Sequence, residues 1–217
     1  MKITIASTLL ASAAAFAPNH EVPTSIASTS SLEAMVFRKN TMPGAIAPTG
    51  LFDPLNFLEK ADESTVLRYR EAEVTHGRVA MLAVVGFLVG EKVEGSSFLF
   101  DSQITGPAIT HFFQVPSLFW AALVASIGAI ELNRAQVAFV SPADLAPAEA
   151  GKMRPDHYPG DIGFDPLGFK PKTQTEFDKM ATRELQNGRL AMLAAAGFLA
   201  QEAADGQGIM EHLGWWQ

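Results

Sequence analysis

The chain has 217 residues, a formal net charge of −7, 48% apolar residues and only 18% charged ones, which suits a single domain that interacts with apolar surroundings. An acidic chain without a basic cluster is a poor candidate for binding nucleic acid. Because the sequence contains no Cys, disulfides, thiolate metal sites, iron–sulfur ligation and cysteine nucleophiles are excluded. It also lacks a Gly-rich phosphate loop, a Gly-x-Ser-x-Gly motif and a His-Glu-x-x-His motif, so we do not expect an enzyme.

Residues 1–30 have the pattern of a targeting presequence. Lys2 precedes an apolar, small-residue run over residues 3–17, and Glu21 is the one acidic residue up to residue 30. This pattern is typical of a signal peptide followed by a Ser/Thr-rich transit segment. The alternative, a first membrane helix, is disfavoured because the run is short and rich in Ala and Ser. We therefore expect the folded domain to comprise residues 31–217.

One stretch of the domain occurs twice. Residues 73–91 and 184–202 are identical at 11 of 19 positions, including a Glu-x-x-x-Gly-Arg core, an Ala-Met-Leu run and a Gly-Phe-Leu trio. Such a match indicates an internal duplication. A Phe-Asp-Pro-Leu sequence precedes each copy, at residues 52–55 and 164–167, and Asp-Pro predicts a turn there. The duplicated unit is therefore a loop followed by a helix.

Three long helices are predicted, over about residues 64–90, 117–139 and 175–204. The first and third contain the two copies of the repeat, and the second begins after Pro116, a residue that favours a helix start. A short amphipathic helix is expected at the C-terminal end, within residues 208–216.

Hydropathy leaves two architectures open, a soluble three-helix bundle and a membrane protein. No segment offers the ~18 uncharged apolar residues that are usual for a spanning helix. If the three helices span, however, one side holds Lys92, whereas the other holds Arg38, Lys39, Lys60, Arg68, Arg70, Arg134, Lys152, Arg154, Lys170, Lys172, Lys179 and Arg183. This asymmetry is expected of a membrane protein. We therefore predict an all-α membrane protein with three transmembrane helices, the first and third crossed about a pseudo-two-fold axis.

Charged residues inside the predicted spans need partners. Glu73 and Arg78 lie about 140° apart around their helix, which turns them away from each other. The repeat supplies other partners, since a two-fold axis between the first and third helices would pair Glu73 with Arg189 and Glu184 with Arg78. Two reciprocal ion pairs leave no net buried charge and fix the register of the helices.

His76 and its counterpart Asn187 lie three residues after these glutamates, on the same helix face. A glutamate that is neutralised by an arginine can still offer its second oxygen to Mg²⁺, and imidazole serves where a macrocycle supplies the other donors. Single donors on separate turns suit one axial ligand to each of several flat metal macrocycles, rather than a caged free ion. The alternative is that His76 and Asn187 make hydrogen bonds between helices.

Small residues accompany these polar ones. Gly77 and Gly188 would let the helices approach closely or let a planar ligand lie flat against them. Gly86 and Gly197 are compatible with close helix packing and equally with a bound carotenoid.

The repeated Glu-x-x-His/Asn-Gly-Arg-x-Ala-Met motif, with a Glu-bearing helix between its copies, resembles the light-harvesting chlorophyll-binding superfamily. In the presequence, Ala15-Phe16-Ala17-Pro18 resembles the cleavage signature of plastid-targeted proteins in algae with complex plastids. The chain is thus most similar to the fucoxanthin chlorophyll a/c-binding proteins. The resemblance implies a multi-pass protein of the plastid thylakoid membrane with a stromal mature N-terminus. It implies chlorophyll a, chlorophyll c and fucoxanthin or a related xanthophyll as cofactors. A photosystem core, neighbouring antenna subunits and thylakoid lipids are the implied partners, in an oligomer.

The resemblance also implies the axial ligands of the chlorophyll magnesium ions, namely Glu73, His76, Glu131, Glu184, Asn187 and Gln201. His212 is a further candidate, although it stands closer to Gln201 than its counterpart in green-lineage relatives does. Gln114 is either a ligand or a polar group of a loop, and His111 and His157 are expected in loops.

The function implied is that of an antenna, which positions pigments and passes excitation to a photosystem without making or breaking a bond. One alternative is a photoprotective member of the same superfamily that quenches excitation. Another, from a different class, is a pigment-free membrane scaffold or transporter whose intramembrane charges relay protons.

Overall fold

The computed structural model describes residues 42–48, 50–94, 104–141, 143 and 151–214, all within one compact unit, Glu33–Gln217. These residues form helices joined by loops, and the extended pairings among them are two isolated bridges, Ile46 with Gly50 and Phe139 with Met153. The predicted presequence, residues 1–30, lies outside the described residues.

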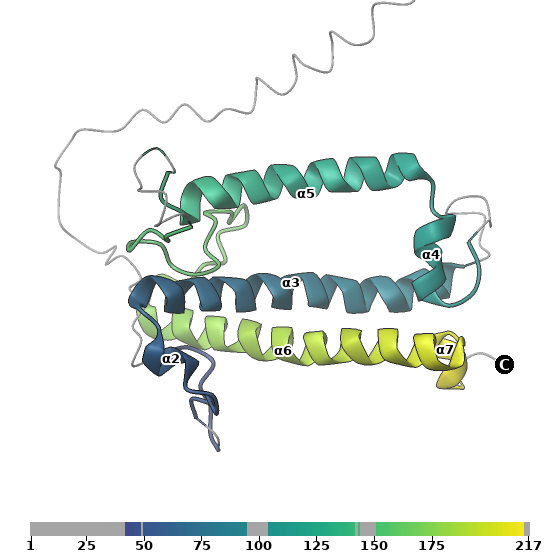
Figure 1. The fold of residues 1–217 in the computed structure, drawn as a ribbon, viewed down its shortest axis with the longest axis horizontal. Coiled ribbons are helices and arrows are strands. Elements are labelled where there is room, and N and C mark those ends of the chain that lie inside the picture. The colour runs from purple at the N-terminus through teal and green to yellow at the C-terminus, as the bar shows by residue number, and fades with distance from the viewer. Residues whose placement is uncertain (1–41, 49, 95–103, 142, 144–150, 215–217) are drawn as a thin grey trace, which may run out of the picture. The chain divides into compact units, whose positions relative to one another are not determined.

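Three long helices dominate Figure 1: α3 (Glu63–Val93), α5 (Ser117–Ala138) and α6 (Gln174–Asp205). Their ends lie within three residues of the predicted ones. Three short helices accompany them: α2 (Phe57–Lys60), α4 (Ala108–Gln114) and α7 (Ile209–His212). Pro116 stands at the N-cap of α5, and α6 ends at Gly206, whose positive φ of 68° allows the left-handed cap that an L side chain disfavours.

Two of the described helices, α3 and α5, are long and apolar enough to cross a membrane. At about 1.5 Å per residue their 31 and 22 residues reach further than the ~30 Å hydrocarbon core of a bilayer. The 32 residues of α6 are long enough but do not pass the same test of composition. The third predicted span is therefore long enough to cross a membrane but is not continuously apolar, because charged and amide side chains interrupt its alanine-rich sequence.

Helices α3 and α6 lie side by side and run in the same direction, whereas α5 runs the opposite way (Figure 1). The two packed helices bury the same three positions of the repeat, which are Val74, Gly77 and Ala80 in α3 and Leu185, Gly188 and Ala191 in α6. Gly77 and Gly188 face each other and allow the close approach, whereas Val74 and Leu185 lie against the loop glycines Gly160 and Gly44.

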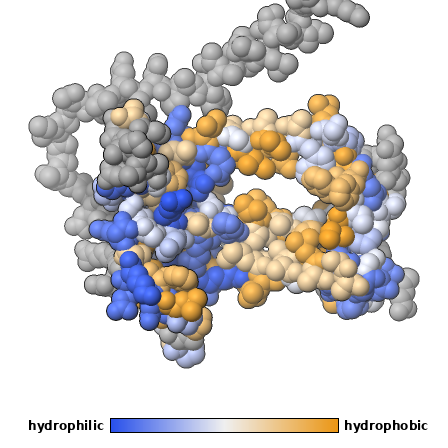
Figure 2. Space-filling view, in the orientation of Figure 1, coloured by the Kyte–Doolittle hydropathy of each residue, from blue (hydrophilic) through white to orange (hydrophobic). Residues whose placement is uncertain are grey.

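Away from this contact the long helices expose apolar side chains. Val79 and Leu82 of α3 are 67% and 76% exposed, and their counterparts in α6, Leu190 and Leu193, are 68% and 74% exposed. In α5 only Ala138 is buried. Figure 2 shows these helices as largely hydrophobic in the middle, with hydrophilic residues gathered toward their ends. Water-soluble proteins rarely expose such continuous apolar surface, which suits contact with lipid or with bound apolar molecules.

The C-terminal ends of α3 and α6 each anchor one short helix through a buried glutamate. Glu202 of α6 accepts a 2.7 Å hydrogen bond from the backbone N–H of Ile109 in the first turn of α4. Glu91 of α3 accepts 2.8 Å bonds from the N–H groups of Ile209 and Met210 in α7. These carboxylates occupy the same repeat position and satisfy backbone donors that a helix start leaves unpaired. The duplication therefore extends to the way each long helix caps a short one.

Candidate functional site

The backbones of α3 and α6 approach each other closely at a pair of glycines. A Cβ atom added at Gly77 would lie 3.0 Å from the Cα of Gly188, and one added at Gly188 would lie 2.9 Å from the Cα of Gly77. No side chain fits between backbones at these distances. The polar residues of the repeat flank this contact on both sides.

Two salt bridges join the helices reciprocally. Arg78 Nε lies 2.6 Å from Glu184 Oε1, and Arg189 Nη2 lies 2.7 Å from Glu73 Oε1. These are the pairs that the repeat predicts. The four side chains are 28–38% exposed, so in water each pair would contribute little, whereas in apolar surroundings the pairing becomes obligatory.

Each arginine also holds a loop. Arg78 Nη1 donates a 2.7 Å hydrogen bond to the carbonyl of Gly160, and Arg189 Nη1 donates a 2.7 Å bond to the carbonyl of Gly44. Both glycines have positive φ, +84° and +88°, which L side chains rarely adopt. The sequence analysis missed these loops, although residues 43–46 and 159–162 share the pattern Pro-Gly-x-Ile.

The two glutamates are not equivalent. Glu73 Oε2 accepts a 2.7 Å bond from Arg70, which lies one turn earlier in α3, so both of its oxygens are paired with arginines. The corresponding position in α6 is Ala181. The expectation that each glutamate keeps its second oxygen unpaired is therefore wrong for Glu73. Glu184 has no second cation among the described residues.

His76 and Asn187 lie on the exposed faces of α3 and α6. His76 Nδ1 is 2.7 Å from the carbonyl of Ala72, so Nδ1 must donate its proton and Nε2 retains the lone pair. That tautomer suits a metal-ligating imidazole. Neither residue makes a hydrogen bond to the other long helix within the described structure, which weighs against the alternative of interhelical bonding.

The other predicted ligands differ in how their polar ends are engaged. The buried amide nitrogen of Gln201 has no hydrogen-bond partner among the described residues. Because Mg²⁺ would bind the amide oxygen and not this nitrogen, the orphaned donor does not support the ligand role. His212 Nδ1 lies 3.1 Å from Asp205 and its side chain is half exposed. Gln114 is engaged at both ends, since it accepts from the N–H of Thr105 and donates to the carbonyl of the same residue. Gln114 is the last residue of α4 and not a loop residue, and its engaged amide favours a structural role over that of a ligand.

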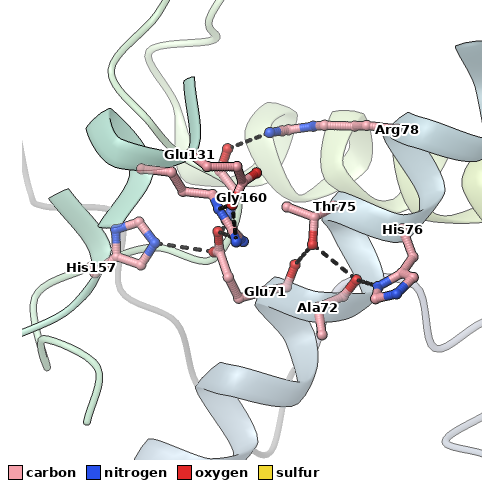
Figure 3. A network of polar contacts seen from close by, with 9 residues as sticks. Glu71, Ala72, Thr75, His76, Arg78, Glu131, His157 and Gly160 are labelled. Carbon is pink, nitrogen blue, oxygen red and sulfur yellow. Dashed lines mark hydrogen bonds and ion pairs between the residues drawn. The ribbon is translucent and has the colours of Figure 1, made fainter. Parts of the chain in front are cut away.

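Glu131 of α5 lies in the polar network of Figure 3. Its Oε2 accepts hydrogen bonds of 2.5 and 3.0 Å from Arg134, one turn later, which leaves Oε1 as the oxygen that could bind a metal ion. Arg134 also reaches Glu71 of α3 at 3.4 Å, and Glu71 in turn is 3.1 Å from His157 Nε2. His157 does lie in a loop, as expected, but it is buried, and His111 lies in α4 rather than in a loop. Neither Glu71 nor Arg134 is among the predicted site residues, because their contacts join α3, α5 and a loop that are distant in sequence.

Two cavities lie beside the contact between α3 and α6, each next to one of the Phe-Asp-Pro-Leu turns. One, of about 430 Å³, is lined by the 158–171 loop, and the other, of about 540 Å³, by the 42–58 segment. The turns share one geometry: Asp53 accepts from the N–H groups of Phe57 and Leu58, and Asp165 from those of Phe169 and Lys170. The N–H groups of Lys170 and Phe169 hold the pKa of Asp165 below its ordinary value.

The donors of this site are single oxygens and nitrogens on separate turns. The described residues contain no group of three or more His, Asp or Glu side chains placed to hold a metal ion. Single donors such as His76 Nε2 and the second oxygen of Glu184, with apolar surface around them, fit a metal macrocycle that brings its own ring nitrogens and needs one ligand from the protein.

Comparison with known proteins agrees with this chemistry. The family model described as Chlorophyll A-B binding protein matches residues 38–203. Light-harvesting complex stress-related protein 3.2 of Chlamydomonas reinhardtii is 44% identical over 194 residues, covering 88% of this chain and 73% of that protein. A fucoxanthin-chlorophyll a-c binding protein of Isochrysis galbana is 48% identical over 169 residues, covering 76% and 77%. Fucoxanthin-chlorophyll a-c binding protein F of Phaeodactylum tricornutum is 34% identical over 206 residues, covering 93% of this chain and 95% of that protein.

These matches confirm the resemblance drawn from the repeated motif. They also confirm that the chain is a pigment-binding protein and not an enzyme, and they leave no support for a pigment-free scaffold or transporter. The chain belongs to the chlorophyll a-b binding protein family, within the light-harvesting superfamily.

Proposed function

We propose that this protein is a light-harvesting antenna that holds chlorophyll a, chlorophyll c and fucoxanthin or a related xanthophyll, and passes excitation to a photosystem. The observation that carries the proposal is the reciprocal Glu–Arg pairing, because it ties two helices together and leaves single donors at their outer faces. Bound pigments supply the excited states, and the chain supplies fixed positions for them.

The magnesium ligands we propose are Glu73 and His76 on α3, Glu131 on α5, and Glu184, Asn187 and Gln201 on α6, with His212 as a further candidate. The support differs from residue to residue. His76 retains an outward Nε2 lone pair, and Glu184 is neutralised through one oxygen only. Gln201 is proposed because the family resemblance implies it as a ligand, which would bind through its amide oxygen. Glu73 accepts from two arginines, so it is the weaker oxygen donor of the repeated pair.

The setting we propose is the plastid thylakoid membrane, with α3, α5 and α6 as three spans, α3 and α6 crossed about a pseudo-two-fold axis, and the mature N-terminus in the stroma. The matched exposure of apolar residues on α3 and α6 supports a third span despite the composition of α6. Residues 1–30 would direct the chain there, and residues 31–217 would form the domain. A photosystem core, other antenna subunits and thylakoid lipids are the proposed partners, in an oligomer. Relatives named chloroplastic support this location.

A photoprotective role is the second candidate. It is favoured by the relatives at 44–46% identity, whose names describe them as stress-related light-harvesting proteins. The fold and the pigment ligands would be the same in either role, and the difference would lie in how quickly excitation is dissipated.

Refolding the domain with purified pigments tests the proposal. Excitation of chlorophyll c or of the carotenoid is expected to produce sensitised chlorophyll a emission, because pigments held close together transfer energy. Absence of that emission from a pigment-loaded complex would overturn the antenna role. A chlorophyll a fluorescence lifetime that is strongly shortened in the loaded complex would instead favour the photoprotective role.

A further inference from the structure

We propose that Glu71 positions Glu131, the proposed pigment ligand of α5, by sharing Arg134 with it. This inference rests on the proposed function, since it assigns a positioning residue to one of the proposed ligands. Figure 3 labels Glu71 of α3, Glu131 of α5, and His157 and Gly160 of the loop between α5 and α6.

Arg134 bridges the two carboxylates. Its Nε and Nη2 donate to Glu131 Oε2 at 3.0 and 2.5 Å, and its Nη1 donates to Glu71 Oε1 at 3.4 Å. The guanidinium is planar, so a hydrogen bond from Nη1 also fixes the directions of Nε and Nη2. Glu71 itself is 2% exposed, whereas the side chain of Glu131 is 49% exposed. The buried Glu71 carboxylate therefore orients the Arg134 guanidinium, which in turn orients the exposed Glu131 carboxylate.

The bond within α5 would be weak alone. A Glu–Arg pair three residues apart on an exposed helix face contributes little in general, and both side chains can rotate. No other contact of Glu131 is present among the described residues. With Glu71 as a second anion, Arg134 is attached to two helices, so Glu131 Oε1 acquires a defined direction.

The repeat provides an internal control for the role of the Glu71 charge. Glu71 Oε2 accepts a 2.6 Å bond from the N–H of Gly160, which anchors the loop. At the same position in α6, Thr182 Oγ1 accepts a 3.1 Å bond from the N–H of Gly44, which anchors the twin loop. A neutral threonine thus suffices for loop anchoring. What Glu71 adds is contact with Arg134 of α5 and with His157.

The competing interpretation is that Glu71 serves the loop alone, through Gly160 and His157. The two interpretations differ for Glu71→Thr, which copies the twin position. If Glu71 acts only on the loop, this variant keeps the loop and leaves the Glu131 pigment unchanged. If Glu71 positions Glu131, the loop remains protected while the Glu131 pigment changes.

The experiment uses the full domain refolded with chlorophylls and xanthophyll. Glu131→Ala first identifies the pigment concerned, as the absorption and circular dichroism band that is lost together with one chlorophyll per chain. We expect Glu71→Thr to shift that band or reduce its occupancy, with the other bands unchanged. Hydrogen exchange at the Gly160 amide, read on the same samples, is expected to keep its protection. Thr182→Val is the matched control, and should expose the Gly44 amide without moving the Glu131 band.

An unchanged Glu131 band in Glu71→Thr would overturn the positioning role while leaving the proposed function intact. An equal shift of the band in His157→Gln would also overturn it, because that variant loosens the loop and leaves Arg134 its contact with Glu71. If Glu131→Ala loses no pigment, then the proposed ligand itself is wrong, and this inference falls with it. Should Glu71→Thr fail to assemble, Arg134→Lys tests the same bridge, because one ammonium group cannot reproduce the planar fork, and an unshifted band there is equally decisive against it.

Discussion

Glu73 and Glu184 occupy one position of the repeat, yet the number of cations around them differs. Glu73 contacts Arg189 and Arg70, each at 2.7 Å, whereas Glu184 contacts Arg78 at 2.6 Å. The difference comes from position 70, whose counterpart in α6 is Ala181. Among the described residues, Glu73 thus has a second arginine partner, Arg70, whereas Glu184 has none.

This asymmetry predicts unequal effects for two matched substitutions. Arg78→Leu leaves Glu184 without a cation in apolar surroundings and is expected to destabilise the complex by on the order of 3 kcal/mol. Arg189→Leu should cost about 1 kcal/mol less, because Glu73 keeps its charge-assisted bond to Arg70. Both variants lose one arginine bond to a loop glycine, so that term cancels. Thermal dissociation of refolded pigment complexes measures the two costs, and equal midpoints would contradict the prediction.

At the scale of secondary-structure elements, the long helices position the short ones through hydrogen bonds to Glu91 and Glu202. Each carboxylate is buried and binds the first backbone N–H groups of one short helix, α7 for Glu91 and α4 for Glu202. A helix of four or seven residues cannot hold its own shape in water, since nucleation is unfavourable at that length. The position of α4 and α7 therefore depends on these caps.

Removing one cap should loosen one short helix and leave the other in place. Glu202→Ala is expected to speed hydrogen exchange at the Ile109 amide, in line with the loss of about 1 kcal/mol of capping energy, without affecting Met210. Glu91→Ala should do the reverse. Glu202→Gln is the control, because its amide oxygen can still accept from Ile109. Loosening of both short helices by either alanine variant would show that the caps do not act separately.

At the scale of the whole molecule, much of what sequence reasoning found is present twice in the sequence. Helices α3 and α6 and both ion pairs follow from matching positions of the repeat, since opposite charges at equivalent sites need a partner across an axis, whereas α5 follows from Pro116 and the apolar residues after it. The Pro-Gly-x-Ile loops are also repeated, but the first copy has four extra residues before its Phe-Asp-Pro-Leu turn, which hides the match. Glu71 has no repeat signal at all because its counterpart is Thr182. Its partners lie on α5 and on a distant loop, so only the folded structure brings them together.

The proposed three-span topology rests most heavily on α6, the helix whose composition alone does not qualify it as a span. Its outward apolar residues match those of α3 in exposure, so α6 would be as costly as α3 to place in water. Because the chain contains no Cys, single cysteines can report sidedness without background. We introduce them at exposed positions before and after each helix, Lys60→Cys and Glu94→Cys around α3, and Lys172→Cys and Gln207→Cys around α6.

In oriented membranes a membrane-impermeant thiol reagent should label Lys60→Cys and Lys172→Cys from one side, and Glu94→Cys and Gln207→Cys from the other. The expected division follows from the parallel packing of α3 and α6 through Gly77 and Gly188, which places equivalent ends of the repeat together. If Lys172→Cys and Gln207→Cys were labelled from the same side, α6 would lie along the membrane surface. The contact of Glu73 with Arg189 could not then form while α3 spans, so the outcome also decides whether both salt bridges lie within the membrane.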